Sequence, residues 1–371
     1  MKTQEIGQSG MIASRVALGV MRMDALDAAD AARTVAVAHD SGIDYFDTAD
    51  IYGFHDHAAH ASSKRFGQAW KDAGLDRSTI FIQTKFGIDY SFGENDGGAN
   101  GYDFSAKHLI DALDHELEAL QTDYVDAVLL HRIDTLFELN EVAEAFDALE
   151  SSGKVRHFGV SNMGPWQIEL LQSGLRQKLE INQLQFGLMH TQMLDAEIQF
   201  NMASDPAADR TGGILPYSRL KHMTIQAWCP FQSGTEYGPF VGNEHFPELN
   251  AELTRLAGKY GSTPNGIAVA WILRHPAGIQ PLLGSMTPER IRQMAAGADI
   301  ELDAVTGGRC IRQPAIRWCE REMTRPLPLR RVFSVHTSQR QSMLCQSTHD
   351  ENNDTNIPRI TSERWHIERG N

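Results

Sequence analysis

Four polar residues of complementary chemistry stand at, or just after, the ends of short apolar segments. They are Asp47 and Tyr52 in DYFDTADIYG, Lys85 in FIQTKFG and His131 in DAVLLHR. A carboxylate, a phenol, an ammonium and an imidazole that lie together can transfer a proton to a carbonyl oxygen. Each residue alone has an ordinary structural explanation, such as a helix cap or a buried hydrogen bond. Four of them at matching ends of successive segments favour a functional site.

The segments that carry these residues belong to an alternation of short apolar strands and amphipathic helices. Helical periodicity covers residues 28–40, 105–120 and 139–151, and Gly153 follows the last of these, where a helix end favours glycine. Eight strand–helix units predict a single (β/α)8 TIM barrel of the α/β class. The eight expected strands are 16–21, 44–47, 80–85, 127–131, 155–160, 181–185, 224–229 and 279–283.

A barrel of this kind carries its chemistry at the carboxyl ends of its strands and on the loops that follow them. Polar residues occupy these positions after the second, third, fourth and fifth expected strands. We therefore expect six of them to converge on one face of the barrel: Asp47, Tyr52, Lys85, His131, Ser161 and Asn162.

Composition excludes several classes of function. The chain has 371 residues, of which 42% are hydrophobic, but no apolar run approaches the roughly 18 residues of a membrane span. Residues 1–10 lack the features of a secretory signal, so we expect a soluble, cytoplasmic protein without a membrane partner. A net charge of −14 argues against a nucleic-acid partner. The four cysteines show no metal-ligand spacing, and Cys229 is expected to be a buried strand thiol.

The order and spacing of four motifs resemble those of the aldo-keto reductases, especially bacterial oxidoreductases of that family. The motifs are GIDYFDTADIYG at 42–53, TK at 84–85, LLHR at 129–132 and GVSN at 159–162, and the resemblance covers about residues 5–304. The resemblance implies one α/β barrel that binds an extended nicotinamide cofactor, usually NADPH, without a Rossmann fold. The absence of a convincing G-x-G-x-x-G loop agrees with this expectation.

The resemblance also assigns roles to the four polar residues. Tyr52 is the proposed general acid, which gives a proton to the carbonyl oxygen as hydride reaches the carbon. Lys85 supplies an ammonium that should lower the pKa of this phenol, and Asp47 pairs with Lys85. His131 is expected to hydrogen-bond the substrate carbonyl and orient it.

Cofactor positions follow from the same resemblance. Ser161, Asn162 and Gln183 match residues that hold the nicotinamide carboxamide, and Trp228 takes the place of an aromatic side chain that stacks on the ring. The segment 283–290 resembles the part that holds the adenosine 2′-phosphate, with charge-assisted bonds expected from two residues, Ser285 and Arg290. Gly284 stands where many relatives have lysine, so NADPH is favoured and NADH is the alternative. Asp24 is a further candidate for the pocket wall.

Two segments depart from the family pattern, and the first is a histidine-rich stretch at 54–60. Relatives usually have an acidic residue soon after the tyrosine, whereas this chain has His55, His57 and His60. These histidines lack the spacing of helical metal ligands, so the stretch is interpreted as a solvated loop near the mouth of the site, with no metal expected.

The second departure is the tail from about residue 305. Residues 306–371 contain eleven arginines and no lysine, hold three of the four cysteines and lose hydrophobic periodicity. Residues 307–320 can be back-translated with degenerate codons and read in the frame that begins at the third base of each codon. That frame can encode Trp-Ala-Leu-Tyr-Pro-Ala-Ala-Gly-Asn-Pro-Leu-Val-stop, which resembles the usual end of these relatives. The hypothesis is therefore an out-of-frame tail, and the alternative is a genuine disordered or partner-binding extension.

The sequence as a whole predicts an NADPH-dependent reductase of small aldehydes or ketones. Two alternatives remain open: a nicotinamide-nucleotide-binding regulatory subunit with little turnover, and a sugar or alcohol dehydrogenase that works in the oxidative direction. The substrate should be selected by the loops at 90–101 and 234–246, and the sequence gives no sign of the oligomeric state.

Overall fold

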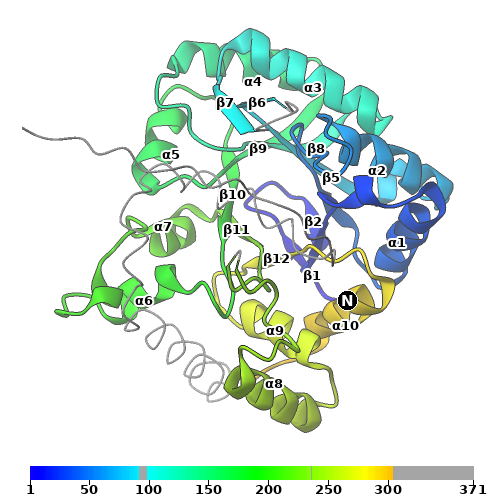
Figure 1. Ribbon diagram of the computed structural model, residues 1–371. Coiled ribbons are helices and arrows are strands. Elements are labelled where there is room, and N and C mark those ends of the chain that lie inside the picture. Colours follow the sequence, from blue (N-terminus) through cyan, green and yellow to red (C-terminus); the bar gives the residue numbers. More distant parts are fainter. Residues whose placement is uncertain (92–97, 235, 304–371) are drawn as a thin grey trace, which may run out of the picture.

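The computed structural model describes residues 1–91, 98–234 and 236–303, and its centre is a closed barrel of eight parallel strands (Figure 1). The predicted single (β/α)8 barrel is confirmed. All eight expected strands are present, with ends that differ from the expected ones by at most a few residues. They are β3 (Ala17–Gly19), β4 (Tyr45–Asp47), β5 (Phe81–Phe86), β8 (Val125–Leu130), β9 (Val155–Ser161), β10 (Leu179–Gln185), β11 (Thr224–Trp228) and β12 (Gln280–Leu283).

Helices form a ring around the barrel (Figure 1). The expected helix 139–151 has the same bounds in the structure, and Gly153 follows its C-cap residue with a left-handed φ of 75°. Ser105 caps another helix by accepting a hydrogen bond from His108 N. The ring comprises α1 (Ala28–Asp40), α2 (Ala61–Asp72), α3 (Ala106–Leu120), α4 (Leu139–Ser151), α5 (Pro165–Gln172), α6 (Gln192–Ile198), α7 (Ile214–Lys221), α8 (Pro247–Tyr260), α9 (Pro264–Leu273) and α10 (Pro288–Ala296), with short 3-10 turns at Met23–Ala25, Arg77–Thr79, Asp205–Ala207 and Gly297–Asp299.

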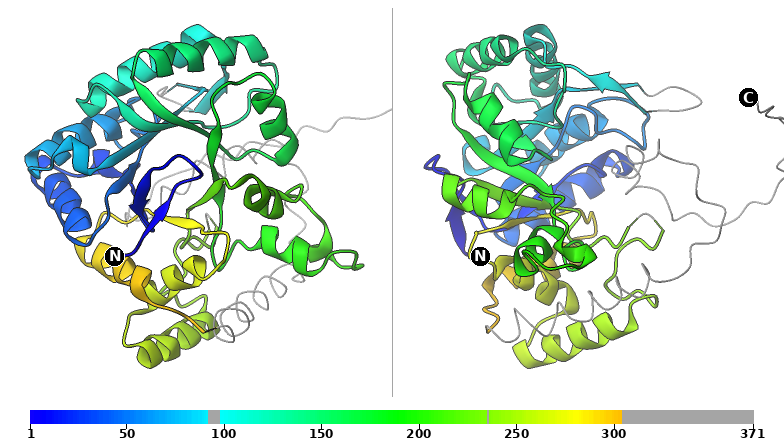
Figure 2. Two further views of the ribbon diagram at one scale, coloured as in Figure 1. Left: turned by 180° about the vertical axis from the view of Figure 1, so that it is seen from behind. Right: turned by 90° about the vertical axis from the view of Figure 1, so that its left-hand side faces the viewer.

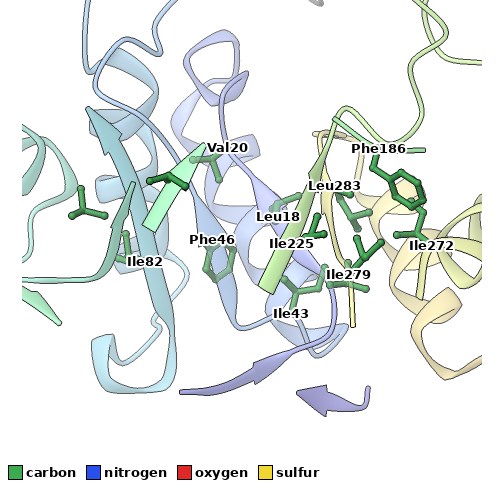
Figure 3. Close-up of a cluster of buried hydrophobic side chains, with 14 of the residues drawn as sticks. Leu18, Val20, Ile43, Phe46, Ile82, Phe186, Ile225, Ile272, Ile279 and Leu283 are labelled. Carbon is green, nitrogen blue, oxygen red and sulfur yellow. The ribbon is translucent and has the colours of Figure 1, made fainter. Parts of the chain in front are cut away.

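Alternate residues of each strand enter two separate cores, as the two-residue period of a strand requires. Outward side chains such as Leu18, Phe46 and Ile82 pack against the helices (Figure 3). Inward side chains such as Tyr45 and Leu129 fill the barrel interior. Because Asp47 and Lys85 share the parity of these inward residues, their side chains also enter the barrel, near its carboxyl end.

Two hairpins were not expected from the sequence. The first, β1 (Thr3–Glu5) with β2 (Ile12–Ser14), closes the amino end of the barrel (Figure 2, left). Its turn is fixed by Gly7 N, which donates to Thr224 Oγ1 at 2.8 Å, and by Gln8 N, which donates to Glu180. The hairpin therefore covers this end of the barrel, and the candidate site residues lie at the opposite, carboxyl end.

The second hairpin pairs β6 (Ile88–Ser91) with β7 (Gly98–Tyr102), in a region that the sequence interpretation treated as a loop. Ile88 is buried against Ile51, next to Tyr52, so the hairpin covers the loop that carries the candidate acid. In the described part of the chain, no helix is long and apolar enough to cross a membrane. The tail from residue 305, and with it the frameshift hypothesis, lies outside the described residues.

Candidate active site

The four expected catalytic residues come together at the carboxyl end of the barrel. Lys85 Nζ donates to Asp47 Oδ2 at 2.7 Å and to Tyr52 OH at 3.3 Å. The rings of Tyr52 and His131 meet edge to face, with centroids 5.9 Å apart. The segments that carry them are separate in sequence, but parallel pairing of β4 with β5 and of β5 with β8 aligns their ends.

Lys85 is fully buried, and its ammonium has a complete set of partners. Its third acceptor is Thr48 O at 2.6 Å. Burial favours the neutral amine, but Asp47 and Tyr52 outweigh it, so the pKa of Lys85 is raised above its ordinary value. The site therefore holds a fixed positive charge next to the phenol at any working pH.

Lys85 lowers the pKa of Tyr52 as expected, but the net pKa is raised, so the expectation of a phenol closer to working pH is wrong. Burial raises the pKa of Tyr52 and is the largest contribution, while the Lys85 charge opposes it only in part. The net pKa lies above its ordinary value near 10, so Tyr52 keeps its proton at neutral pH. A proton donor needs this protonation state.

His131 is neutral at physiological pH. Burial, together with the nearby charges of Lys85 and Arg132, holds its pKa well below the ordinary value. Its Nδ1 is buried and has no hydrogen-bond partner among the described residues. A neutral imidazole offers one N–H and one lone pair, so it can hydrogen-bond a carbonyl oxygen without adding charge.

An amide network beneath the site was missed in the sequence. Gln83 Nε2 and Gln183 Nε2 both donate to Asp47 Oδ1, at 2.5 and 2.9 Å, and both also donate to Gln226 Oε1. These bonds fix the carboxylate that faces Lys85. The sequence did contain one sign of this network. Gln83 lies two residues before Lys85 on β5, and residues two apart in a strand point to the same side. Gln183, expected as a nicotinamide contact, has its amide nitrogen committed to this network.

The other nicotinamide candidates form one polar wall. Ser161 Oγ donates to Gln183 O at 3.0 Å, Asn162 Nδ2 donates to Ser161 Oγ at 2.8 Å, and Trp228 Nε1 donates to Asn162 Oδ1 at 3.0 Å. Asn162 has a left-handed φ of 57°, which is uncommon outside glycine. Such local strain is concentrated at functional sites because the surrounding structure must hold it in place.

A cavity of about 900 Å³ joins these groups. Its size suits a nucleotide cofactor together with a small substrate. Cys229 also lies on its wall with a φ of 47°, just past β11 and half-buried, so the expectation of a buried strand thiol is wrong. Lys85 lies behind the wall, and the other expected catalytic and cofactor residues line the cavity: Asp47, Tyr52, His131, Ser161, Asn162, Gln183, Trp228, Ser285 and Arg290.

Asp24 does not line this cavity. Its buried carboxylate accepts hydrogen bonds from His55 N at 2.7 Å, Asp56 N at 3.2 Å and Ser62 Oγ at 3.0 Å. Asp24 thus holds the loop that follows Tyr52. Within the described ranges, no group of three or more His, Cys, Asp or Glu side chains could hold a metal ion. His60 of the histidine-rich stretch contacts the carboxylate of Glu116.

A buried acidic network supports the loop from the outer side of the barrel. Glu116 accepts from Thr84 Oγ1 at 2.6 Å and Ser63 Oγ at 3.0 Å, and its other oxygen lies 2.7 Å from His60 Nδ1. Burial lowers the pKa of His60, but the hydrogen bond to Glu116 and the charges of Glu116 and Asp50 together outweigh burial, so the net pKa is raised. Burial and the Glu116 charge raise the pKa of Asp50 to about 8, and His60 and Lys85 oppose this in part.

This raised pKa predicts a stability change in Asp50→Asn. Asp50 is neutral when folded and ionised when unfolded between its unfolded pKa near 3.8 and about 8, so its contribution to stability is lost as pH rises through this window. Asparagine has no such dependence. We expect the stability of the variant relative to wild type to increase by up to ~1.4 kcal/mol per pH unit from pH 5 to 8.

Urea unfolding at several pH values would measure this difference. Exposed Asp40→Asn serves as the control and should follow the wild-type curve. Parallel curves for wild type and Asp50→Asn would show that Asp50 is already ionised in the folded protein.

Comparisons with known proteins agree with this geometry. The chain is 34% identical to 6-dehydroglucose reductase of Agrobacterium fabrum over 266 residues, covering 71% of this chain and 81% of that protein. It is 32% identical to the uncharacterized oxidoreductase YcsN of Bacillus subtilis over 295 residues, 78% of this chain and 90% of that one.

The fold matches the crystal structure of a Bombyx mori aldo-keto reductase in complex with NADP. The TM-score is 0.62 at 21% identity, over 85% of this chain and 93% of that one. The model of the Aldo/keto reductase family matches residues 15–309. Since this match spans most of the chain, the protein belongs to the aldo/keto reductase family.

Proposed function

We propose that the protein reduces small aldehydes or ketones to alcohols with a nicotinamide cofactor, and that Tyr52 is the general acid. The observation that carries this proposal is the Tyr52 hydroxyl, which lies on the cavity wall and 3.3 Å from the buried Lys85 ammonium. A phenol in that position has a proton to give, and a fixed cation stabilises the phenolate that remains.

The other residues have separate tasks in this proposal. A bound nicotinamide cofactor supplies the hydride. Neutral His131 donates a hydrogen bond to the substrate carbonyl and orients it beside Tyr52. Asp47 holds the Lys85 ammonium and is itself held by Gln83 and Gln183. The charge that develops on the carbonyl oxygen therefore meets groups that are already in place, which lowers the cost of reorganisation.

The residues of the cavity wall fit such a cofactor. Ser161, Asn162 and Trp228 would hold the nicotinamide end, where polar groups lie beside a large aromatic face. Ser285 and Arg290 would hold a 2′-phosphate at the start of α10, where free backbone N–H groups also favour an anion. NADPH is therefore the favoured cofactor, and NADH is the alternative.

Arg290→Ala should weaken this preference. Loss of a charge-assisted bond to the 2′-phosphate should raise the KM for NADPH about tenfold and leave the KM for NADH within about twofold. Initial rates with both cofactors, at saturating carbonyl substrate, would measure the ratio. Exposed Arg33→Ala, on α1, controls for the loss of a positive charge. An equal rise for both cofactors would mean that Arg290 does not contact the phosphate.

The first test of the function is NADPH consumption by the purified protein with 4-nitrobenzaldehyde. Sugar aldehydes belong in the same screen, because a similar protein is named as a 6-dehydroglucose reductase. Turnover supports the proposal, and faster NADP⁺ reduction with sugars or alcohols would favour the oxidative direction. NADPH binding, followed by fluorescence, without turnover of any carbonyl compound would contradict it.

A further inference from the structure

Arg132 is a half-buried arginine beside the candidate active site. It follows His131 at the end of β8, and no hydrogen bond or ion pair joins it to any residue of the described ranges. Arg77, which is also half-buried, binds Thr122, Ile80 O, Tyr124 O and Asp126. A guanidinium removed from water costs free energy unless it is paired. Arg132 therefore has donors available for a ligand.

Electrostatics supports the same view of this side chain. Burial lowers the pKa of Arg132 from its ordinary value, and the hydroxyl groups of Tyr102 and Tyr52 offset this only in part. Among the described residues, no carboxylate contributes to this balance. A bound anion would offset the cost of burying the Arg132 charge. Planar guanidinium groups bind oxyanions through two parallel hydrogen bonds.

Arg132 lies at the junction of two cavities. One is the cavity that contains Tyr52 and His131, and the other is a neighbouring cavity of about 1200 Å³. Asn162 and Trp228 belong to the walls of both, so the two spaces are adjacent over the candidate nicotinamide site. A substrate whose carbonyl meets Tyr52 can therefore place its remaining atoms in the second cavity, past Arg132.

The strand order separates Arg132 from the expected phosphate site of the cofactor. In the closed barrel, β8 and β12 are four strands apart and lie on opposite sides. Ser285 and Arg290 follow β12, whereas Arg132 follows β8. The position next to His131 therefore belongs to the substrate side.

The wall of the second cavity is locally basic on an acidic protein. The net charge of the chain is −14, yet two arginines, Arg132 and Arg210, face this cavity with a single described acidic residue, Glu236. Uncharged amides and hydroxyls supply most of the remaining polar wall. A protein with a negative net charge repels anions at long range. The two arginines give this cavity a local positive charge, which favours an anionic ligand there.

We propose that the carbonyl substrate carries an oxyanion, either a carboxylate or a phosphate, which Arg132 binds while the carbonyl group faces Tyr52 and His131. This inference rests on the proposed reductase function and specifies the substrate class of that site. Arg132 then determines specificity: it contributes binding free energy for acidic substrates without taking part in the proton transfer.

Matched substrate pairs would test the proposal in the wild-type protein and in Arg132→Met. The pairs are 4-carboxybenzaldehyde with methyl 4-formylbenzoate, and glyceraldehyde 3-phosphate with glyceraldehyde. We expect the wild type to favour one acidic member at least tenfold in kcat/KM, and the pair that shows this identifies carboxylate or phosphate. Arg132→Met should lose about 10–100-fold for that acid, mainly through KM, and stay within about threefold for its neutral partner.

Control variants separate a direct contact from a general charge effect. Arg33→Met removes an exposed positive charge from α1 and should keep the preference for the acid, and Arg132→Lys should retain part of it. NADPH affinity, measured by fluorescence, should be the same in Arg132→Met and wild type. Loss of NADPH binding, an equal loss for both members of a pair, or no acid preference in wild type would each overturn the proposal.

A direct binding measurement distinguishes failure of this inference from failure of the proposed function. Benzoate and inorganic phosphate are titrated into the NADPH-bound protein by calorimetry. Binding of either by wild type and not by Arg132→Met would support the oxyanion site even if no carbonyl compound is reduced. Absence of binding to wild type would overturn it even if neutral aldehydes are reduced.

Discussion

Tyr52→Phe is expected to lose turnover by about 10²–10⁴-fold, because general acid catalysis contributes on this scale. The substitution removes only the hydroxyl that lies 3.3 Å from Lys85 Nζ. The phenylalanine ring can keep the contacts that Tyr52 makes with Phe54 and His131. Cofactor affinity should therefore change little, and the loss should appear in kcat.

The measurement is single-turnover oxidation of NADPH by an aromatic aldehyde, with cofactor binding followed separately by fluorescence. Tyr217→Phe is the matched control, since it removes a hydroxyl that donates to Glu169 on the outer helices. The control should keep turnover within about twofold, because surface changes away from a site have small effects. Equal turnover in Tyr52→Phe and wild type would assign the proton donor to another group.

The barrel could be predicted because its signals are local and repeat eight times. Each strand is a short apolar run, and each long helix has a periodic face with a cap such as Ser105 or an end such as Gly153. The two hairpins lacked such signals. β1 and β2 have three residues each, too few to show an alternating pattern, and their positions depend on contacts with residues such as Thr224, far away in the sequence.

The candidate site could be predicted as a set of positions, but its energetics depends on the fold. Strand ends identified Asp47, Lys85 and His131, whose convergence follows from parallel pairing. The direction of the Tyr52 pKa did not follow from residue types, because it depends on whether burial or the Lys85 charge is larger. The Glu116 network was also invisible, since its members meet only after α2 and α3 pack on the barrel.

Lys85→Met is the second substitution for which we expect a large effect, and it should lower both turnover and the free energy of unfolding. Without the ammonium, burial and the Asp47 charge both raise the pKa of Tyr52, and its phenolate loses the nearest stabilising charge. Turnover should fall by at least about 10³-fold if the phenolate forms during reaction. Asp47 would remain as a buried carboxylate with only the amide donors of Gln83 and Gln183, which should cost about 3–5 kcal/mol of stability.

The double variant Lys85→Met/Asp47→Asn separates these two consequences. Asparagine removes the unpaired buried charge and can still accept from the two glutamine amides, so much of the stability lost in Lys85→Met should return. Turnover should not return, because no cation faces Tyr52. Urea unfolding and single-turnover rates on both single variants and the double variant complete the cycle. A double variant that is no more stable than Lys85→Met would mean that Lys85 and Asp47 contribute to stability through packing. A double variant that regains turnover would mean that the Lys85 charge does not stabilise the phenolate.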